Sequence, residues 1–124
     1  MNEFPYDTSY DPALPVCAVT FSVAITGSKI SLPAILDTGA DATLVPQNYL
    51  QQLGSRRAFE VGLRSQWGER RVVFLHRVDI QIGELTLPGI YVVGDDFGNE
   101  VILGRDVLNR LRLVLDGPVQ LTQI

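Results

Sequence analysis

Residues 35–41 read I-L-D-T-G-A-D, an apolar strand ending that runs directly into an acid, a hydroxyl and a glycine. An aspartate is rarely placed beside a core unless it opens a turn or its surroundings hold it there. Thr38 brings a hydroxyl that both donates and accepts hydrogen bonds. Gly39 has no Cβ, so a backbone N–H can approach the Asp37 carboxylate closely. The stretch therefore leaves two interpretations open, a turn-opening aspartate and an aspartate whose environment is built for it.

Strand patterns surround this stretch and predict a mainly β protein, closed or sandwiched. Some runs alternate between apolar and polar residues, as half-buried strands do, and others are continuously apolar. The C-terminal run 113–124 reads as strand, Gly-Pro turn and strand. The other predicted strands are 16–25, 30–36, 59–64, 70–75, 78–82, 90–93 and 101–103.

One clear helix pattern lies near the C-terminus, in R-D-V-L-N-R-L-R at 105–112. Its apolar residues fall on one side, and arginines stand near its end, where the helix dipole favours cations. A shorter helical turn is predicted from Pro46 onward, with Gly54 as its stop. The chain is thus expected to be almost entirely β, with one short C-terminal helix and at most one more.

Length and composition bound the organisation of the chain. With 124 residues, 46% of them hydrophobic, it is expected to form one domain around a single core. Residues 1–15 carry three prolines and are predicted to be an irregular N-terminal arm, which leaves 16–124 as the domain. Cys17 is the only cysteine, so no intrachain disulfide can form.

Charge and hydropathy exclude several classes of partner from the prediction. The net charge of −4 offers no basic surface for nucleic acid. No segment has the pattern of a secretory signal, and no stretch approaches the roughly 20 apolar residues of a membrane span. The sequence therefore predicts a cytoplasmic protein with no nucleic acid and no membrane among its partners.

A single carboxylate in a dry pocket would mostly become protonated and inert. Two carboxylates in contact cannot both ionise, so they share one proton, and one can act as base on a water while the other acts as acid. The chain contains no second D-T-G or D-S-G. A catalytic pair would therefore need Asp37 from a second copy, related by a two-fold axis.

The segment I-L-D-T-G-A-D-A-T-L-V at 35–45 resembles the active-site segment of the retropepsin family, the retroviral-type aspartic proteases. V-I-L-G-R-D-V-L-N-R-L at 101–111 resembles the second signature of the family, in which Gly-Arg-Asp or Gly-Arg-Asn opens the helix. Two linked motifs are more specific than either alone. The resemblance spans roughly residues 16–115 and implies a closed β-barrel with one short C-terminal helix, active as a homodimer.

The resemblance also implies roles for residues of the two motifs. Asp37 would be the catalytic carboxylate, one per subunit, and Thr38 would interlock with its symmetry mate beneath the pair. Gly39 would offer its carbonyl and a close backbone approach to the substrate, and Ala40 would line the pocket beside the scissile bond. Asp41 would meet the substrate backbone and pair with Arg105, and Gly104 would pack under the active-site loop.

The hairpin tip S-Q-W-G-E at 65–69 would be the flap that closes over bound peptide, with Trp67 and Gly68 contacting substrate. Here the sequence departs from the retroviral pattern, whose tip is richer in glycine. The C-terminal run also departs, so the resemblance does not extend to the interleaved terminal strands of viral dimers.

The leading functional hypothesis is therefore an aspartic endopeptidase that hydrolyses an extended peptide or protein substrate with a water activated by the Asp37 pair. It would use no metal and no other cofactor. Two alternatives stay open. The first is a catalytically weak or inactive retropepsin-like module for dimerisation and peptide binding, which the atypical flap motivates. The second is a stable monomer whose carboxylate pair forms only transiently.

Two further features lie outside the motifs. Six arginines fall between positions 56 and 77, and they are expected to form the solvated face of the hairpin. A second interpretation is that they attract acidic substrates or partners. His76 is the only histidine and sits in a predicted strand, so it is interpreted as structural rather than catalytic.

Overall fold

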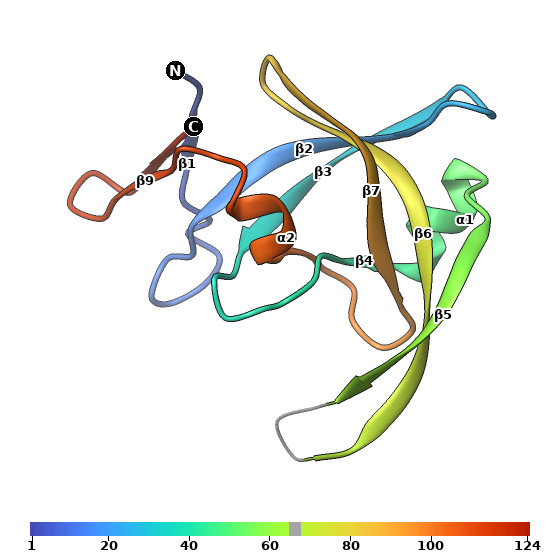
Figure 1. The fold of residues 1–124 in the computed structure, drawn as a ribbon. Helices are drawn as coiled ribbons and strands as arrows, with labels where there is room; N and C mark the ends of the chain where they lie inside the picture. The colour runs from blue at the N-terminus through green and yellow to red at the C-terminus, as the bar shows by residue number, and fades with distance from the viewer. Residues whose placement is uncertain (65–67) are drawn as a thin grey trace.

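The computed structural model describes residues 1–64 and 68–124 and is built almost entirely of β-strands (Figure 1). Two short helices, α1 (Gln47–Leu53) and α2 (Arg105–Leu108), complete it. The strands are β1 (Glu3–Pro5), β2 (Val16–Val23), β3 (Ser28–Leu36), β4 (Leu44–Pro46), β5 (Arg57–Arg64), β6 (Arg70–Ile82), β7 (Leu85–Asp95), β8 (Val101–Leu103), β9 (Val114–Asp116) and β10 (Leu121–Gln123).

The main sheet closes on itself. Its strand order is β2-β3-β8-β4-β7-β6-β5, and β2 also pairs with β6, so that six strands form a closed barrel and β5 extends it. Closure removes the exposed edges that an open sheet would present. The mainly β, closed-barrel architecture expected from the sequence is confirmed.

Two parallel pairings bring the sequence motifs together. β3 runs parallel to β8, with Leu36 opposite Leu103, so that Asp37 and Gly104 follow neighbouring strand ends. β4 lies between β8 and β7 and pairs with β8 through Leu44 and Ile102. The segment from 37 to 43 therefore leaves β3, passes over the end of β8 and returns to the sheet as β4.

The core fills the barrel with aliphatic side chains from almost every strand and from both helices. Alternate residues of β2 and β6 point inward, as the period of a half-buried strand requires. The burial of apolar side chains is the main favourable contribution to the free energy of folding. The largest fully buried side chains are Phe21, Leu50, Leu53, Ile80, Ile82, Leu103, Val19, Val45, Val78, Val92, Val93 and Val101.

The predicted hairpin forms from β5 and β6 and projects from the barrel. Arg64 pairs with Arg70 at its outer end. The strands predicted at 70–75 and 78–82 are one continuous strand, because no glycine or proline separates them. Within the predicted tip, Ser65, Gln66 and Trp67 lie outside the described residues. Gly68 has φ of 83°, a conformation that favours glycine.

The helices differ in how closely they follow the sequence pattern. α1 begins after Pro46 and ends at Gly54, whose φ of 67° closes the helix in the left-handed conformation, as predicted. α2 has only four residues, shorter than the predicted 105–112. Beyond Asn109, backbone N–H groups reach back three residues instead of four, which replaces the α-helix by tighter turns.

The two ends of the chain form a separate three-stranded sheet in the order β1-β10-β9. The C-terminal strand-turn-strand prediction is confirmed by β9 and β10. The expectation of an irregular N-terminal arm is wrong for residues 3–5, which form the strand β1. The sequence pattern does not indicate this strand, because its pairing partner, β10, lies at the opposite end of the sequence. Among the described residues, no helix combines the length and apolar character that crossing a membrane requires.

Candidate active site

Asp37 is held at the end of β3 by backbone hydrogen bonds. Its N–H donates to the carbonyl of Leu103 at 3.1 Å, and its carbonyl accepts from the N–H of Ala40 at 3.2 Å. The N–H of Gly39 donates to carboxylate oxygen Oδ1 at 2.9 Å. A Cβ at position 39 would lie 3.1 Å from that same oxygen, so glycine leaves room for the contact. The half-buried carboxylate is therefore oriented by its own loop.

Gly104 forms the floor beneath this loop. A Cβ at position 104 would lie 2.5 Å from the carbonyl oxygen of Ala42 and 2.9 Å from that of Ala40, closer than side chains approach in proteins. The N–H of Arg105 donates to the carbonyl of Ala40 at 2.8 Å. Glycine is required here by lack of space, because its φ of −90° is open to any residue.

Arg105 clamps the loop from the other side. One guanidinium nitrogen, Nη1, donates to the carbonyl of Thr38 at 2.7 Å, and the other, Nη2, contacts the Asp41 carboxylate. The expected ion pair between Asp41 and Arg105 therefore forms. Because the two side chains are 86% and 42% exposed, the pair adds little stability by itself, and its effect is to fix the loop conformation.

Thr43 and Asp106 are two residues that sequence reasoning missed. The Thr43 hydroxyl donates to the Asp106 carboxylate at 2.8 Å and accepts the N–H of Gly104 at 3.2 Å. Asp106 also accepts the N–H groups of Thr43 and Val107. Thr43 is fully buried, and its neighbours in sequence, Ala42 and Leu44, are apolar. A buried hydroxyl needs a partner, and that requirement was the available signal.

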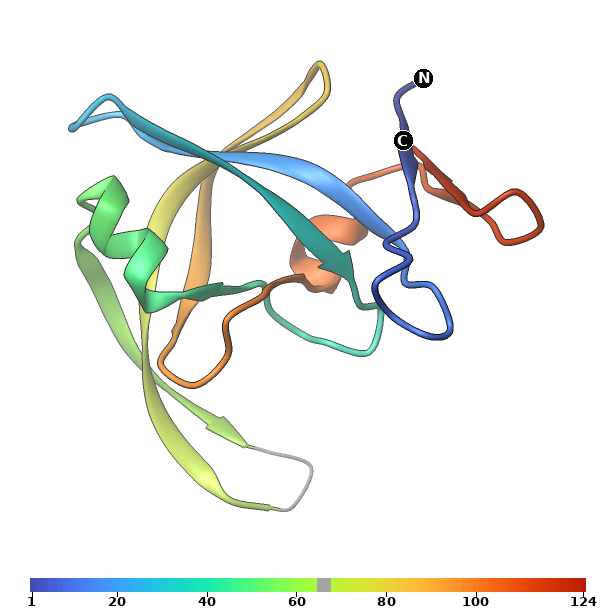
Figure 2. The same cartoon turned by 180° about the vertical axis from the view of Figure 1, so that it is seen from behind.

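The predicted site residues are thus brought together by the fold, with the exception of the hairpin tip. Thr38, Gly39 and Asp41 are exposed, and Asp37 and Ala40 are half-buried. The hairpin β5–β6 extends beneath the 37–43 loop in both views (Figures 1 and 2). Gly68 stands near its end, whereas Trp67 lies outside the described residues.

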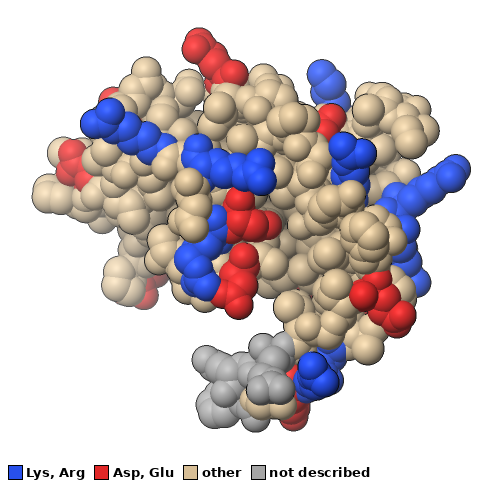
Figure 3. All heavy atoms as spheres, in the orientation of Figure 1, with Lys and Arg blue, Asp and Glu red and all other residues tan. Residues whose placement is uncertain are grey.

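Within the described part of the chain, the only hydrogen bond to the Asp37 carboxylate comes from the N–H of Gly39. Charged groups cluster around it, and Figure 3 shows acidic and basic side chains side by side on the face that carries the 37–43 loop. In residues 1–64 and 68–124, no group of three or more His, Cys, Asp or Glu residues is arranged to hold a metal ion.

Comparisons with known proteins show which family this chain belongs to. Residues 21–110 match the model of a family described as gag-polyprotein putative aspartyl protease. The chain is 26% identical over 98 residues to DNA damage-inducible protein 1 of Neurospora crassa, covering 76% of this chain and 22% of that protein. It is 27% identical over 99 residues to UBA domain-containing protein Mud1 of Schizosaccharomyces pombe, covering 77% of this chain and 29% of that protein. The chain therefore spans less than a third of the length of these relatives.

Solved structures show the same fold. A retropepsin-like aspartic protease from Rickettsia conorii superposes with a TM-score of 0.64 at 16% identity, covering 98% of this chain and 88% of that chain. An EIAV protease complexed with the inhibitor HBY-793 superposes with a TM-score of 0.60 at 24% identity, covering 82% and 93%. The family match covers both the Asp37 loop and the Gly104 turn that supports it. This chain belongs to the gag-polyprotein putative aspartyl protease family and has the retropepsin-like fold.

Proposed function

We propose that the protein is an aspartic endopeptidase whose active site is completed by a second copy of the chain. The observation that carries the proposal is the Asp37 carboxylate, oriented by the N–H of Gly39 at the end of β3, in a loop whose other acid, Asp41, is paired with Arg105. Membership of an aspartyl protease family supports the reaction class.

In the proposed reaction the two Asp37 carboxylates share one proton. The ionised one removes a proton from a water, whose oxygen attacks the peptide carbonyl carbon, while the protonated one donates to the carbonyl oxygen. The resulting tetrahedral intermediate collapses when the C–N bond breaks. The leaving nitrogen takes a proton from one carboxyl group, while one hydroxyl of the intermediate gives its proton to the other carboxylate and becomes the new carbonyl oxygen. No covalent bond to the protein forms, and the pair returns to one shared proton.

Two structural features support assembly from two copies. Thr38 is exposed in the single chain, directly beside the half-buried Asp37, so its side chain is available to a partner. The terminal sheet and the 37–43 loop lie on the same side of the barrel, away from α1, in both views (Figures 1 and 2). β9 is an edge strand there, and Val114 and Leu115 are 39% and 48% exposed. We infer that β9 lies against its symmetry mate in the dimer.

The substrate is proposed to be an extended peptide that lies between the 37–43 loop and the β5–β6 hairpin. The carbonyl of Gly39 and the carboxylate of Asp41 would meet its backbone, with Ala40 beside the scissile bond. Trp67 and Gly68 would cover it from the hairpin. An extended peptide fits this arrangement because its backbone groups are free to hydrogen-bond on both sides.

The test uses the Asp37→Asn variant, with Glu84→Gln as a control that makes the same acid-to-amide change on the exposed turn after β6. Both are incubated with a diverse peptide library between pH 3 and 7, and their association is followed by sedimentation. Asp37→Asn is expected to abolish cleavage and leave the dimer intact, while Glu84→Gln retains both properties. Cleavage by Asp37→Asn at the wild-type rate would end the proposal. A wild-type protein that dimerises and binds peptides but cuts none would favour the non-catalytic module.

A further inference from the structure

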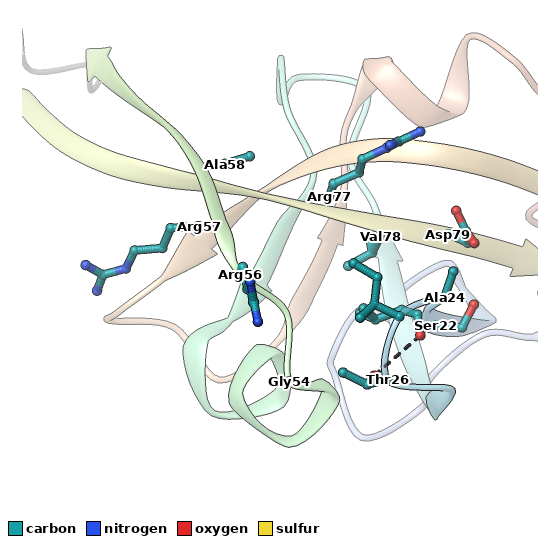
Figure 4. Close-up of a pocket in the computed structure, with 12 residues that line it drawn as sticks. Ser22, Ala24, Thr26, Gly54, Arg56, Arg57, Ala58, Arg77, Val78 and Asp79 are labelled. Atoms are coloured by element: carbon teal, nitrogen blue, oxygen red, sulfur yellow. Dashed lines mark hydrogen bonds between the residues drawn. The ribbon is translucent and has the colours of Figure 1, made fainter.

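An open groove of about 500 Å³ lies at the end of the barrel where the β2–β3 hairpin turns (Figure 4). Three segments line it. Residues 22–26 span the end of β2 and the turn after it, Gly54 and residues 56–58 span the end of α1 and the start of β5, and residues 77–79 belong to β6. Its walls are mainly apolar, with Val23, Ile25 and Val78 among the lining side chains. The groove has no part in the proposed reaction.

The groove exists because two strands share one edge of β6. β5 pairs with β6 from Arg70 to His76, and β2 pairs with it from Asp79 to Gln81. Between them, Arg77 and Val78 have no strand partner on that edge among the described residues. The barrel wall is therefore interrupted for two residues. A β-bulge stands beside the gap, since the register of β5 shifts between Arg57 and Phe59.

The floor of the groove is fixed before any ligand arrives. The Thr26 hydroxyl donates to the carbonyl of Leu53 at 2.8 Å, which ties the β2–β3 turn to the end of α1. A Cβ at Gly54 would lie 3.0 Å from the Thr26 methyl group, so the two segments are already in close contact. A preformed site avoids the entropy loss of ordering loops on binding.

The rim of the groove is cationic, although the whole chain carries a net charge of −4. Three arginines, Arg56, Arg57 and Arg77, line it against one acid, Asp79, whose carboxylate accepts the N–H of Gly89 at 2.9 Å. No carboxylate pairs with these arginines in the described part of the chain. Arg57 is braced by Phe74, whose ring centre lies 3.9 Å from the guanidinium carbon. Basic side chains also gather at this edge of the molecule in Figure 3.

The directions of the arginines decide what kind of anion fits. In Figure 4 the side chain of Arg56 runs down beside the groove, while those of Arg57 and Arg77 leave it in opposite directions. One small anion cannot contact guanidiniums that diverge, whereas carboxylates spaced along an extended chain can. We propose that this groove is a docking site for an acidic, extended segment of a partner protein, with an apolar side chain in the groove and flanking carboxylates on Arg56, Arg57 and Arg77.

The docking site is distinct from the Asp37 loop. β3 begins at Ser28 beside the groove and ends at Leu36 before Asp37. At about 3.3 Å per residue, the strand separates the two places by roughly 25–30 Å. An occupant of the groove therefore leaves the loop at Asp37 free, and its binding is measurable whether or not the chain cleaves peptides.

The test measures fluorescence anisotropy with the full chain carrying Asp37→Asn, so that no peptide is cut. The probe is a fluorescein-labelled nine-residue peptide of alternating Glu and Leu, and a matched peptide replaces each Glu by Gln. The acidic peptide is expected to bind at least tenfold more tightly, and less so as salt is added. The pair Arg56→Gln with Arg77→Gln should weaken it at least fivefold. The equivalent pair Arg110→Gln with Arg112→Gln, exposed on the other side, should change it less than twofold.

Two further measurements locate the ligand and identify its class. Ala24→Trp fills the groove from an exposed lining position and should reduce binding at least tenfold without unfolding the chain. Amide shifts in NMR spectra should change at residues 22–26, 54–58 and 77–79. Shifts confined to the 37–43 loop, or equal binding of the Gln peptide, would overturn the proposal. Competition by dodecanoate as strong as that by the unlabelled peptide would also overturn the proposal, because the groove would then be a binding site for a small amphiphile.

Discussion

The hydroxyl of Thr43 donates a 2.8 Å hydrogen bond to the carboxylate of Asp106, which lies 63 positions further along the chain. The same hydroxyl accepts the N–H of Gly104. One buried side chain therefore joins the end of the Asp37 loop to the start of α2. The loop is held from beneath by polar contacts as well as by apolar packing.

Replacing Thr43 with Val keeps the shape of the side chain and removes the hydroxyl. The N–H of Gly104 loses its partner, and Oδ1 of Asp106 keeps only the N–H of Val107. We expect the free energy of unfolding to fall by about 2 kcal/mol. Urea denaturation measures the change. Thr86→Val, on an exposed position of β7, is the matched control and should change stability by less than about 0.5 kcal/mol. Equal effects of the two variants would contradict the role given to Thr43.

Gly104→Ala introduces a Cβ into space occupied by the carbonyl oxygens of Ala42 and Ala40. Backbone has to move, and we expect a loss of about 2–4 kcal/mol in thermal or urea unfolding. Gly117→Ala is the control, because a Cβ there meets nothing within 4 Å. The prediction fails if both alanine variants are as stable as the wild type.

Arg105→Lys retains the positive charge but loses the planar fork that reaches the Thr38 carbonyl and the Asp41 carboxylate together. If the proposed function holds, the loop loosens and kcat/KM for a cleaved peptide should fall about tenfold, with less than about 1 kcal/mol lost in stability. Arg112→Lys, exposed beyond α2, should leave both quantities unchanged. A Lys variant as active as the wild type would show that charge alone is sufficient.

Leu115→Lys probes the edge strand β9. The side chain is 48% exposed in the single chain, so the folded monomer should tolerate the change. If β9 lies against its symmetry mate, burying an unpaired charge there should weaken dimerisation at least about tenfold in sedimentation. Val72→Lys, an exposed apolar position on the hairpin strand β6, is the comparison. Loss of association only in the Val72 variant would point to a different interface.

His76 gives a pH dependence with a definite sign. Its ring is buried, its Nδ1 lies 2.9 Å from the Ser55 hydroxyl oxygen, and its Nε2 has no partner in the described part of the chain. Burial, and then the charge of Arg57, lowers the pKa of His76 below its ordinary value of 6.5. The unfolded chain therefore binds a proton more readily, and stability present above about pH 6.5 is lost as the pH falls below it.

Because His76 is the only histidine, proton NMR of the untagged chain follows its titration without ambiguity. The measured pKa should lie below 6.5, and the urea midpoint should drop between pH 7.5 and 5.5. In His76→Gln the same drop should be smaller, since the titrating ring is gone. A pKa at or above 6.5 would contradict the buried neutral ring.

The parts of the fold that the sequence predicts are those written in local patterns. Strand alternation located β2 and the second half of β6, and a continuous apolar run located part of β7. The Pro46 and Gly54 pair bounded α1 correctly. The two motifs also predicted that Asp41 and Arg105 would meet. Local chemistry is sufficient for the strands and the helix, because period and cap each act within a few residues. The contact between Asp41 and Arg105 joins positions 64 residues apart, and it was implied by the family resemblance.

Pairings between distant segments left no such local pattern. β1 is too short to be recognised, and it exists only because β10 lies beside it. Thr43 looks like any strand residue until the fold brings Asp106 within reach. The groove beside Arg77 arises from two strands sharing one edge of β6, a relationship that no segment shows alone.

The pairing of β1 with β10 has one more consequence. The N–H of Asn2 donates to the carbonyl of Ile124 at 2.8 Å, and the N–H of Ile124 donates back to Asn2 at 2.9 Å. Both termini thus open at one corner, side by side. The domain can therefore be inserted into a loop of a host protein with both connections at this corner. A short glycine linker between the two termini should also permit circular permutation, with new termini in a surface loop.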